Sequence, residues 1–269
     1  MTQTRTDPAP AVPPATPQHR PLSYTIRLIL LNLLFWTIAP LVTLVFAMIA
    51  IPYATLFGLI RRNRRKTLRL IRRSISYYGA AIIRCGWPLV RFRYVDHAPH
   101  ETPPFVFVSN HRSSSDAFLM ACLPFECIQV LNNWPSRIPV IGILSRIAGY
   151  LKVREMPFDD FVRAGSSLLA DGVSIIAFPE GTRSGSRNIG QFHGSAFRLA
   201  QQSHVKIVPL AISGNENIPS RGSLLLHPGF IVISKLPAVT PEHYENMNAY
   251  KLKTEVRDMI RRQLDAQST

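Results

Sequence analysis

The feature that most constrains this chain is an uncharged apolar run of 33 residues, from Leu28 to Ile60. As one α-helix it would be about 50 Å long, whereas the hydrocarbon core of a bilayer is about 30 Å thick. Two full spans and a turn would need more than about 40 residues. The run therefore predicts either one tilted span with an interfacial remainder or two half-length helices that bend at Pro40. Its length and lack of charge disfavour a buried core helix.

A strongly basic segment follows the apolar run. Residues 61–73 contain eight Lys and Arg residues in thirteen positions. Such residues collect on the cytoplasmic flank of membrane segments and attract anionic lipid by about 1 kcal/mol each. Apolar residues keep helical spacing here at Leu68, Ile71, Ile75, Tyr78 and Ile82. We expect a helix on an anionic phospholipid membrane that leads to a domain facing the cytoplasm, which places the protein at the cytoplasmic (inner) membrane.

The net charge of +15 is concentrated near the N-terminus. Residues 1–95 carry a net charge of +13, whereas residues 96–269 carry +2. A nucleic-acid-binding protein would spread its basic residues over a folded face, so this distribution favours a membrane and argues against nucleic acid as partner. The three cysteines, Cys85, Cys122 and Cys127, form no C-x-x-C pair, which favours a reducing compartment and argues against disulfides or a zinc site.

The chain divides into three expected parts. Residues 1–24 are proline-rich and poor in apolar residues, which predicts a disordered tail. Residues 25–76 hold the expected membrane-embedded helices and the basic interfacial helix, and residues 77–269 hold one folded domain. In that domain, strand-like apolar runs alternate with helical patterns, which predicts an α/β fold with a mixed, largely parallel sheet flanked by helices. The expected strands are Phe105–Val108, Cys127–Leu131, Gly149–Val153, Val173–Phe178, Lys206–Ile212 and Phe230–Ser234, and the longer expected helices are Phe158–Ala170, His193–Ser203 and Asn248–Leu264.

A polar turn that contains His111 follows the first expected strand. On an uninterrupted helix, His111 and Asp116 would point about 140° apart. With His111 in the turn and Asp116 in the first turn of the next helix, the carboxylate can fold back onto an imidazole nitrogen. A histidine whose tautomer is fixed by a buried aspartate is a general base, because its other ring nitrogen is free to take a proton from a hydroxyl.

A second polar turn follows the strand expected at Val173–Phe178. Ligands of open α/β sheets bind at the carboxyl ends of strands, where both turns are expected. Gly181 permits close backbone approach, and Arg183 offers a planar fork suited to bidentate phosphate recognition. Glu180 can accept a hydrogen bond from Arg183 or from a substrate hydroxyl.

Together the two turns resemble the first and third signature blocks of the 1-acylglycerol-3-phosphate acyltransferase (lysophospholipid acyltransferase) family. The matching residues are Asn110-His111-x-Ser113-x-x-Asp116 and Phe178-Pro179-Glu180-Gly181-Thr182-Arg183-Ser184, separated by about 70 residues. Ile138-Pro139-x-x-Gly142 resembles the second block and Val208-Pro209-Leu210 the fourth. The likeness covers roughly residues 77–235.

The resemblance implies an α/β fold of the glycerol-3-phosphate acyltransferase type behind a membrane-embedded N-terminal segment, with residues 77–269 as the catalytic domain. It implies that His111 and Asp116 activate the acceptor hydroxyl. It also implies that the third block binds the acceptor phosphate through Glu180, Gly181, Thr182 and Arg183.

Other parts of the likeness are looser. The apolar segment at 138–144 would line an acyl groove, lie against the membrane or pack in the core, and the candidates for the groove are Ile138, Pro139, Gly142 and Pro209. Two positions depart from the family pattern. Asn132 and Asn133 stand where many members carry Lys, and the strand that starts at Gly149 ends in Val153-Arg154-Glu155 instead of a hydrophobic residue followed by Asp-Arg. Arg154 is expected to reach the phosphate from one residue out of register.

The expected reaction moves a fatty acyl group from acyl carrier protein or coenzyme A to the sn-2 hydroxyl of 1-acylglycerol-3-phosphate (lysophosphatidate). The product is phosphatidate for phospholipid biosynthesis, and we expect neither a further cofactor nor a metal ion. The nearest alternative keeps the chemistry and uses another acceptor, such as lyso-ornithine lipid or another lysophospholipid.

Two alternatives belong to other classes. A serine hydrolase would use one of Ser113–Ser115, but the chain has no G-x-S-x-G elbow, and these serines are expected as helix N-cap and first-turn residues. A non-enzymatic membrane-binding module accounts for residues 1–76 and leaves both polar turns without a role.

Overall fold

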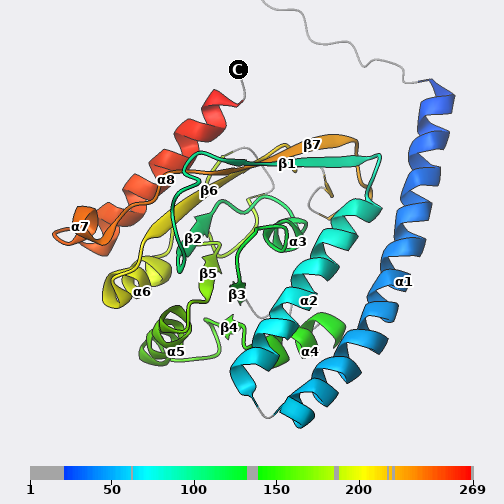
Figure 1. Cartoon of the computed structure of the whole chain (residues 1–269). Helices are drawn as coiled ribbons and strands as arrows, with labels where there is room; N and C mark the ends of the chain where they lie inside the picture. Colours follow the sequence, from blue (N-terminus) through cyan, green and yellow to red (C-terminus); the bar gives the residue numbers. More distant parts are fainter. Residues whose placement is uncertain are drawn as a thin grey trace, which may run out of the picture.

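The structure is a computed structural model that describes residues 21–61, 63–131, 139–184, 188–216, 218–219 and 222–267. Within these residues, seven strands form one sheet in the order β1-β7-β6-β2-β5-β3-β4 (Figure 1). Strands β2 to β6 are parallel, whereas β7 is antiparallel to β6 and parallel to β1. The mixed, largely parallel sheet predicted from the sequence is confirmed. The strands are β1 Val90–Asp96, β2 Val106–Ser109, β3 Cys127–Leu131, β4 Leu151–Lys152, β5 Ser174–Ala177, β6 Ile207–Ser213 and β7 Gly229–Lys235.

Two strands differ from the prediction. Strand β1 was not expected, although its buried Val90 and partly buried Phe92 and Tyr94 alternate with exposed arginines. Strand β4 has only two residues, because the backbone turns at Gly149 with φ +76° before it and again directly after Lys152.

Helices cover both faces of the sheet, as expected. Figure 1 shows α5, α6 and α8 on one side and α2 and α3 on the other. Helices α5 and α6 match the predicted segments within two residues at each end. The helices are α1 Leu22–Arg61, α2 Arg64–Cys85, α3 Asp116–Met120, α4 Pro139–Ala148, α5 Phe158–Ala170, α6 Ser195–Ser203, α7 Pro241–Tyr244 and α8 Ala249–Ala266.

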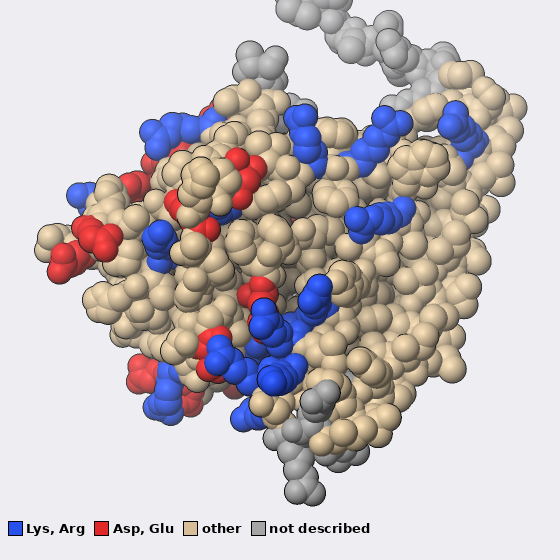
Figure 2. Space-filling view, in the orientation of Figure 1, with Lys and Arg blue, Asp and Glu red and all other residues tan. Residues whose placement is uncertain are grey.

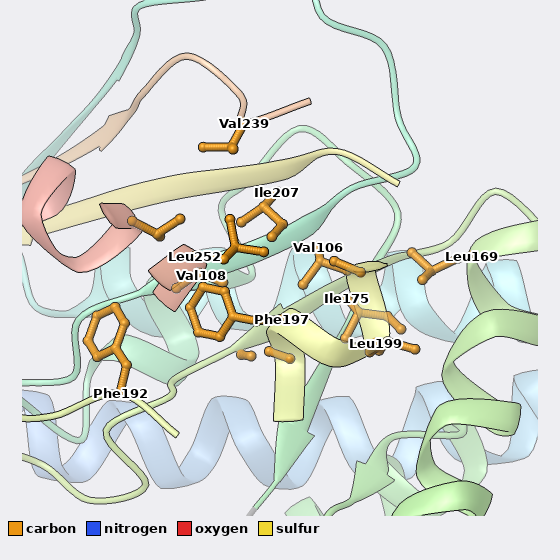
Figure 3. Packing of buried hydrophobic residues seen from close by; sticks show 14 of the residues in the cluster. Val106, Val108, Leu169, Ile175, Phe192, Phe197, Leu199, Ile207, Val239 and Leu252 are labelled. Atoms are coloured by element: carbon orange, nitrogen blue, oxygen red, sulfur yellow. The ribbon is translucent and has the colours of Figure 1, made fainter. Parts of the chain in front are cut away.

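Side chains along β2 point alternately to the two faces of the sheet and contribute to a hydrophobic core on each face. Val106 and Val108 point toward α5, α6 and α8, where Figure 3 shows them with Phe197. Phe105, which precedes β2, and Phe107 point to the opposite side, toward α2 and α3. Because successive side chains of a strand face opposite sides, a strand buried on both faces is apolar at every position. All four side chains are fully buried, so β2 is fixed at the centre of the sheet.

Helix α1 is one unbroken helix of 40 residues with Pro40 and Pro52 inside it. The alternative of two half-length helices that bend at Pro40 is therefore wrong. A proline removes one backbone hydrogen bond and favours a kink. Here, contacts with α2 hold the segment beyond Pro40, since the Thr43 hydroxyl lies 2.9 Å from the Tyr78 hydroxyl and the Phe46 ring stacks on Tyr78 at 4.7 Å.

The described part of α1 is long and apolar enough to cross a membrane, and only 6% of its most apolar window is buried in the protein. This excludes a core helix. The helix begins at Leu22, inside the stretch 1–24 expected to be disordered, and residues 1–20 lie outside the described residues. The division expected between residues 76 and 77 falls within α2.

Charged side chains are distributed unevenly over the surface. Figure 2 shows an extensive surface without acidic or basic side chains along α1, and basic side chains gathered where α2 begins. Large exposed apolar residues of α1 form the uncharged surface, among them Leu33, Leu44, Met48 and Leu56. The exposed basic residues of α2 are Arg64, Arg65, Lys66, Arg69 and Arg73. An apolar helix beside a basic helix end is the arrangement expected for a protein on an anionic membrane.

Candidate active site

The candidate site is built by three loops that leave three neighbouring strands at the same edge of the sheet. Strands β6, β2 and β5 are adjacent and parallel, so their carboxyl ends lie together. The loop after β2 carries His111, the loop after β5 carries residues 178–184, and the loop after β6 begins at Gly214. The prediction that the first two loops converge is confirmed by direct contacts, because the backbone N–H of Ser184 donates to the carbonyl oxygen of His111 at 2.8 Å.

His111 and Asp116 form the pair predicted from their spacing. The imidazole Nδ1 lies 2.7 Å from Asp116 Oδ2. The Asp116 side chain is fully buried, whereas that of His111 is 21% exposed, and the Phe178 ring stacks on the imidazole at 4.5 Å. Oδ2 also accepts the backbone N–H groups of Arg112 and Ser113 at 2.8 and 3.0 Å.

A carboxylate can only accept hydrogen bonds, so the imidazole nitrogen that lies against Oδ2 is the donor of the pair. Nδ1 of His111 therefore carries a proton, and Nε2 has the free lone pair that a general base needs.

The serines between His111 and Asp116 match the prediction only in part, because Ser115 alone takes the predicted N-cap position of α3. The Ser113 hydroxyl donates to the carbonyl oxygen of Ile218 at 2.7 Å instead of capping α3. Ser115 occupies the N-cap position of α3, but its side chain makes no capping hydrogen bond. The first N–H groups of α3 are met by backbone carbonyls, since the N–H of Asp116 donates to Ser113 at 3.3 Å and those of Phe118 and Leu119 donate to Ser115 at 3.0 and 2.9 Å.

Glu180 connects the third block to the first. Its Oε1 accepts the backbone N–H of His111 at 2.7 Å, and its Oε2 accepts that of Gly190 at 2.8 Å. Burial raises the pKa of the Glu180 carboxyl, which is opposed by these two N–H groups and by the His111 ring and reinforced by Asp116. The expectation that Glu180 contacts the acceptor phosphate is not met by this geometry, because both oxygens are engaged and a carboxylate would repel a phosphate.

The other phosphate-binding candidates are separated in space. Gly181 has φ +68°, which favours glycine, and the His193 ring lies where a Cβ atom would be in tight contact, at 3.2 Å. Thr182 is exposed, and Arg183 is half-buried at the edge of a cavity. Arg154 lies exposed in the turn after β4, which is three strands from β2, or on the order of 14 Å across the sheet. Arg183 is therefore the candidate arginine nearer to the His111 loop, since the adjacent Ser184 donates to the carbonyl oxygen of His111.

An apolar cavity of about 630 Å³ adjoins this loop cluster. It is lined mainly by α1, α2, α3 and residues 218–219 and 222–226, and its lining includes Ser114, Ser115 and Arg183. Apolar cavities of this size that carry a few polar groups are typical ligand sites.

The cavity differs from the acyl groove expected from the sequence. Ile138 lies outside the described residues, and Pro139 begins α4. Helix α4 lines the cavity with Leu144 and Ser145, beyond Gly142. Pro209 is buried in β6 between β2 and β7, at a central position of the sheet.

Sequence reasoning missed the loop after β6. Asn215 and Glu216 follow a predicted strand, just as His111 and Glu180 do. In the structure, the Asn215 amide donates to Asp116 and Glu216 pairs with Arg112. The rule that polar residues after parallel strands form the site would have found both residues if it had been applied to every strand.

Comparison with known proteins gives consistent relatives. The family model described as Acyltransferase matches residues 90–213. The 1-acyl-sn-glycerol-3-phosphate acyltransferase alpha of Mus musculus is 32% identical over 203 residues, covering 73% of this chain and 68% of that protein. The Homo sapiens protein of the same name is 31% identical over 202 residues, covering 73% and 68%. A chloroplastic 1-acyl-sn-glycerol-3-phosphate acyltransferase of Arabidopsis thaliana is 29% identical over 199 residues, covering 72% of this chain and 54% of that protein.

The fold also matches a solved structure. The 1-acyl-sn-glycerophosphate acyltransferase PlsC of Thermotoga maritima superposes with a TM-score of 0.75 at 22% identity, covering 91% of this chain and 98% of that chain. Both chains therefore have the same fold. Together with the mouse and human relatives, the matched model places the chain: it belongs to the 1-acyl-sn-glycerol-3-phosphate acyltransferase family.

Proposed function

We propose that this protein transfers a fatty acyl group from a thioester to the sn-2 hydroxyl of lysophosphatidate and so forms phosphatidate for phospholipid biosynthesis. The observation that carries the proposal is the 2.7 Å contact between His111 Nδ1 and buried Asp116, which leaves Nε2 free. The names of the relatives point to the same acceptor.

The proposed chemistry needs only groups of the site and the two substrates. Nε2 of His111 removes the proton of the acceptor hydroxyl as the oxygen attacks the thioester carbonyl. The tetrahedral intermediate then expels the thiolate, which takes the proton back from the imidazolium. Asp116 holds the ring and stabilises its positive charge. A positioned general base of this kind contributes about 10²- to 10⁴-fold to the rate.

Substrate binding follows from the surroundings of the pair. Arg183 supplies a positive charge for the acceptor phosphate at the rim of the apolar cavity, which is suited to an acyl chain. The acyl donor is a thioester of acyl carrier protein or coenzyme A. Helix α1 and the basic end of α2 hold the protein on the cytoplasmic membrane, with the catalytic domain facing the cytoplasm.

The contacts of Ser113 argue against a serine nucleophile. Its hydroxyl donates to a backbone carbonyl, so it is not activated by His111. A membrane-binding module without activity would have no use for a buried, fully hydrogen-bonded carboxylate beside an imidazole.

The test measures transfer of labelled acyl groups by membranes that contain wild type, His111→Ala, or the control His243→Ala. Exposed His243 of α7 pairs with Glu255 of α8, away from the loops after β2, β5 and β6. We expect phosphatidate from lysophosphatidate with wild type and the control, and a loss of about 10²- to 10⁴-fold for His111→Ala. Acyl carrier protein and coenzyme A thioesters, with and without a chelator, are compared in the same assay.

A His111→Ala variant that keeps wild-type activity would overturn the mechanism. Product only from lyso-ornithine lipid or another lysolipid would keep the mechanism and reject lysophosphatidate as the acceptor. Loss of activity on chelation would reject the metal-free mechanism.

A further inference from the structure

The Asp116 carboxylate is held by groups on both of its oxygens. In the described part of the chain, Oδ2 has three donors, which are His111 Nδ1 and the N–H groups of Arg112 and Ser113. Oδ1 has a different donor, the side-chain amide nitrogen of Asn215. The three donors on Oδ2 come from the His111 loop itself, whereas Asn215 comes from 99 residues further along the chain. Asn215 is therefore the group that fixes the carboxylate from outside its own loop.

The loop after β6 is built to deliver this amide. Gly214 turns the chain with φ +80°, and a Cβ atom there would lie 2.1 Å from the carbonyl oxygen of Phe230, so only glycine fits. Residues next to Asn215 bind the same loop as Asp116, since Glu216 pairs with Arg112 and the Ile218 carbonyl accepts from Ser113. Asn215 is thus held in register with the His111 loop by the residues that follow it.

The amide is used for its N–H and not for general stability. Asn215 is fully buried, and its Oδ1 has no hydrogen-bond partner in the described part of the chain. A buried amide oxygen without a partner is costly, and such groups in native structures call for a functional explanation. If the position served stability alone, an apolar side chain or an amide with both polar atoms hydrogen-bonded would suit it better.

We propose that Asn215 is a positioning residue of the acyl transfer, and this inference rests on the proposed function. Its N–H to Oδ1 stops the carboxylate from rotating, so Oδ2 stays on Nδ1 of His111 and Nε2 stays directed at the acceptor hydroxyl. Without this donor, Oδ1 is a buried charged oxygen without a partner, and Asp116 relieves the cost by turning or by binding a proton. Either change weakens the support of the imidazolium in the transition state.

The first experiment compares the kinetics of Asn215→Ala with those of the matched control Asn248→Ala. Asn248 caps α8 by accepting the N–H of Lys251, so its replacement removes an amide that serves stability only. We expect Asn215→Ala to lower kcat by about 10- to 100-fold, the range for a hydrogen bond to a charged group, with an acceptor KM within about threefold of wild type. A kcat equal to that of Asn248→Ala would overturn the proposal.

The second experiment uses Asn215→Asp and a pH profile. Two carboxylates in contact share one proton at low pH, and this proton restores a donor to Asp116 Oδ1. At higher pH the proton is lost and the two charges repel each other. We therefore expect the kcat ratio of Asn215→Asp to wild type to fall as pH rises, and to drop below that of Asn215→Ala. A purely structural defect would give a ratio that does not depend on pH, which would reject the positioning role.

A third measurement separates this proposal from the proposed reaction. In detergent micelles, NMR detects the Nδ1 proton of His111 as a downfield resonance while it bonds to Asp116. We expect this resonance to weaken or shift upfield in Asn215→Ala and to stay unchanged in Asn248→Ala. If wild type acylates no lysolipid, the proposed function fails and the resonance still decides the role of Asn215. An unchanged resonance in Asn215→Ala would overturn that role whatever the reaction is.

Discussion

The backbone N–H of His111 donates to Oε1 of Glu180 at 2.7 Å, and its carbonyl oxygen accepts the N–H of Ser184 at 2.8 Å, so the two sequence blocks that resemble the family meet at the backbone of His111. The second oxygen of Glu180 accepts the N–H of Gly190, and Gly190 lies beyond the third block. One buried carboxylate thus holds the His111 loop against the loop that carries Arg183. Glu180 therefore fixes the backbone at His111.

Replacement of Glu180 by Gln is expected to lower kcat by about 10- to 100-fold, with a smaller effect on acceptor KM. A Gln side chain has one acceptor oxygen, so the N–H of His111 or of Gly190 loses its partner, at a cost of about 1–3 kcal/mol. Steady-state kinetics with lysophosphatidate would show this. A variant in which only KM rises would instead assign Glu180 to acceptor binding.

Glu180 also makes stability depend on pH. Because burial raises the pKa of its carboxyl, the folded state binds more protons than the unfolded state between the ordinary glutamate pKa and the raised value. The contribution of the protonated group is fully present below the ordinary pKa and is lost as pH rises through the folded pKa. The Tm of wild type relative to Glu180→Gln should therefore fall as pH is raised from the ordinary glutamate pKa upward. A constant difference across that series would show that the pKa is not raised.

Arg183→Ala is expected to raise the KM for lysophosphatidate by about 10- to 100-fold, because one hydrogen bond between charged groups is lost. The KM for an acceptor without phosphate, such as monoacylglycerol, should stay the same. Arg183→Lys should be intermediate, since Lys is a point charge without the planar fork. Arg154→Ala is the comparison, and its expected effect is small because β4 lies three strands from β2. If Arg154→Ala raised the KM for lysophosphatidate more than Arg183→Ala does, Arg154 would be the residue that binds the phosphate.

Gly181→Ala is expected to raise acceptor KM as well as to lower Tm. Ala at φ +68° is strained by about 1–2 kcal/mol, and its Cβ would press on the His193 ring. Gly172→Ala is the matched control, since Gly172 has φ +80° and nothing lies within 4 Å of an added Cβ atom. Both variants should lose similar stability, and only Gly181→Ala should change the kinetics. Equal kinetics would mean that the conformation at Gly181 does not matter for acceptor binding.

Asn32→Leu is expected to loosen the contact between α1 and the chain at Leu226. The buried Asn32 amide donates to the Leu226 carbonyl at 3.0 Å and accepts the Leu226 N–H at 2.7 Å. Loss of both bonds leaves two backbone groups without partners, at about 1–3 kcal/mol each. Hydrogen exchange of the Leu226 amide should become faster and Tm should fall. Thr37→Val should change neither, because exposed Thr37 bonds only to Leu33 of its own helix in the described structure.

The local pattern of apolar and polar residues was sufficient to predict many of the helices and strands. Helices α5 and α6 and strands β3, β5 and β6 lie where periodicity placed them, because each is a run of residues whose own spacing selects helix or strand. The same holds for the pair His111 and Asp116, whose five-residue separation across a strand-to-helix turn is a local fact. Local pattern did not give the length of β4, which is set by turns on either side of it.

The sequence by itself determined the family to which the chain belongs and the pair His111 and Asp116, which we propose as the general base, since both rest on short motifs. Tertiary structure alone decided what surrounds them. The strand order that sets β6, β2 and β5 side by side brings Glu180 and Asn215 to opposite sides of the His111 loop. Tertiary contacts also decided that α1 continues past Pro40 and that it lines the cavity together with residues 218–219 and 222–226. These features depend on hydrogen bonds between residues that are 35 to 194 positions apart, and periodicity within a short window carries no information about such contacts.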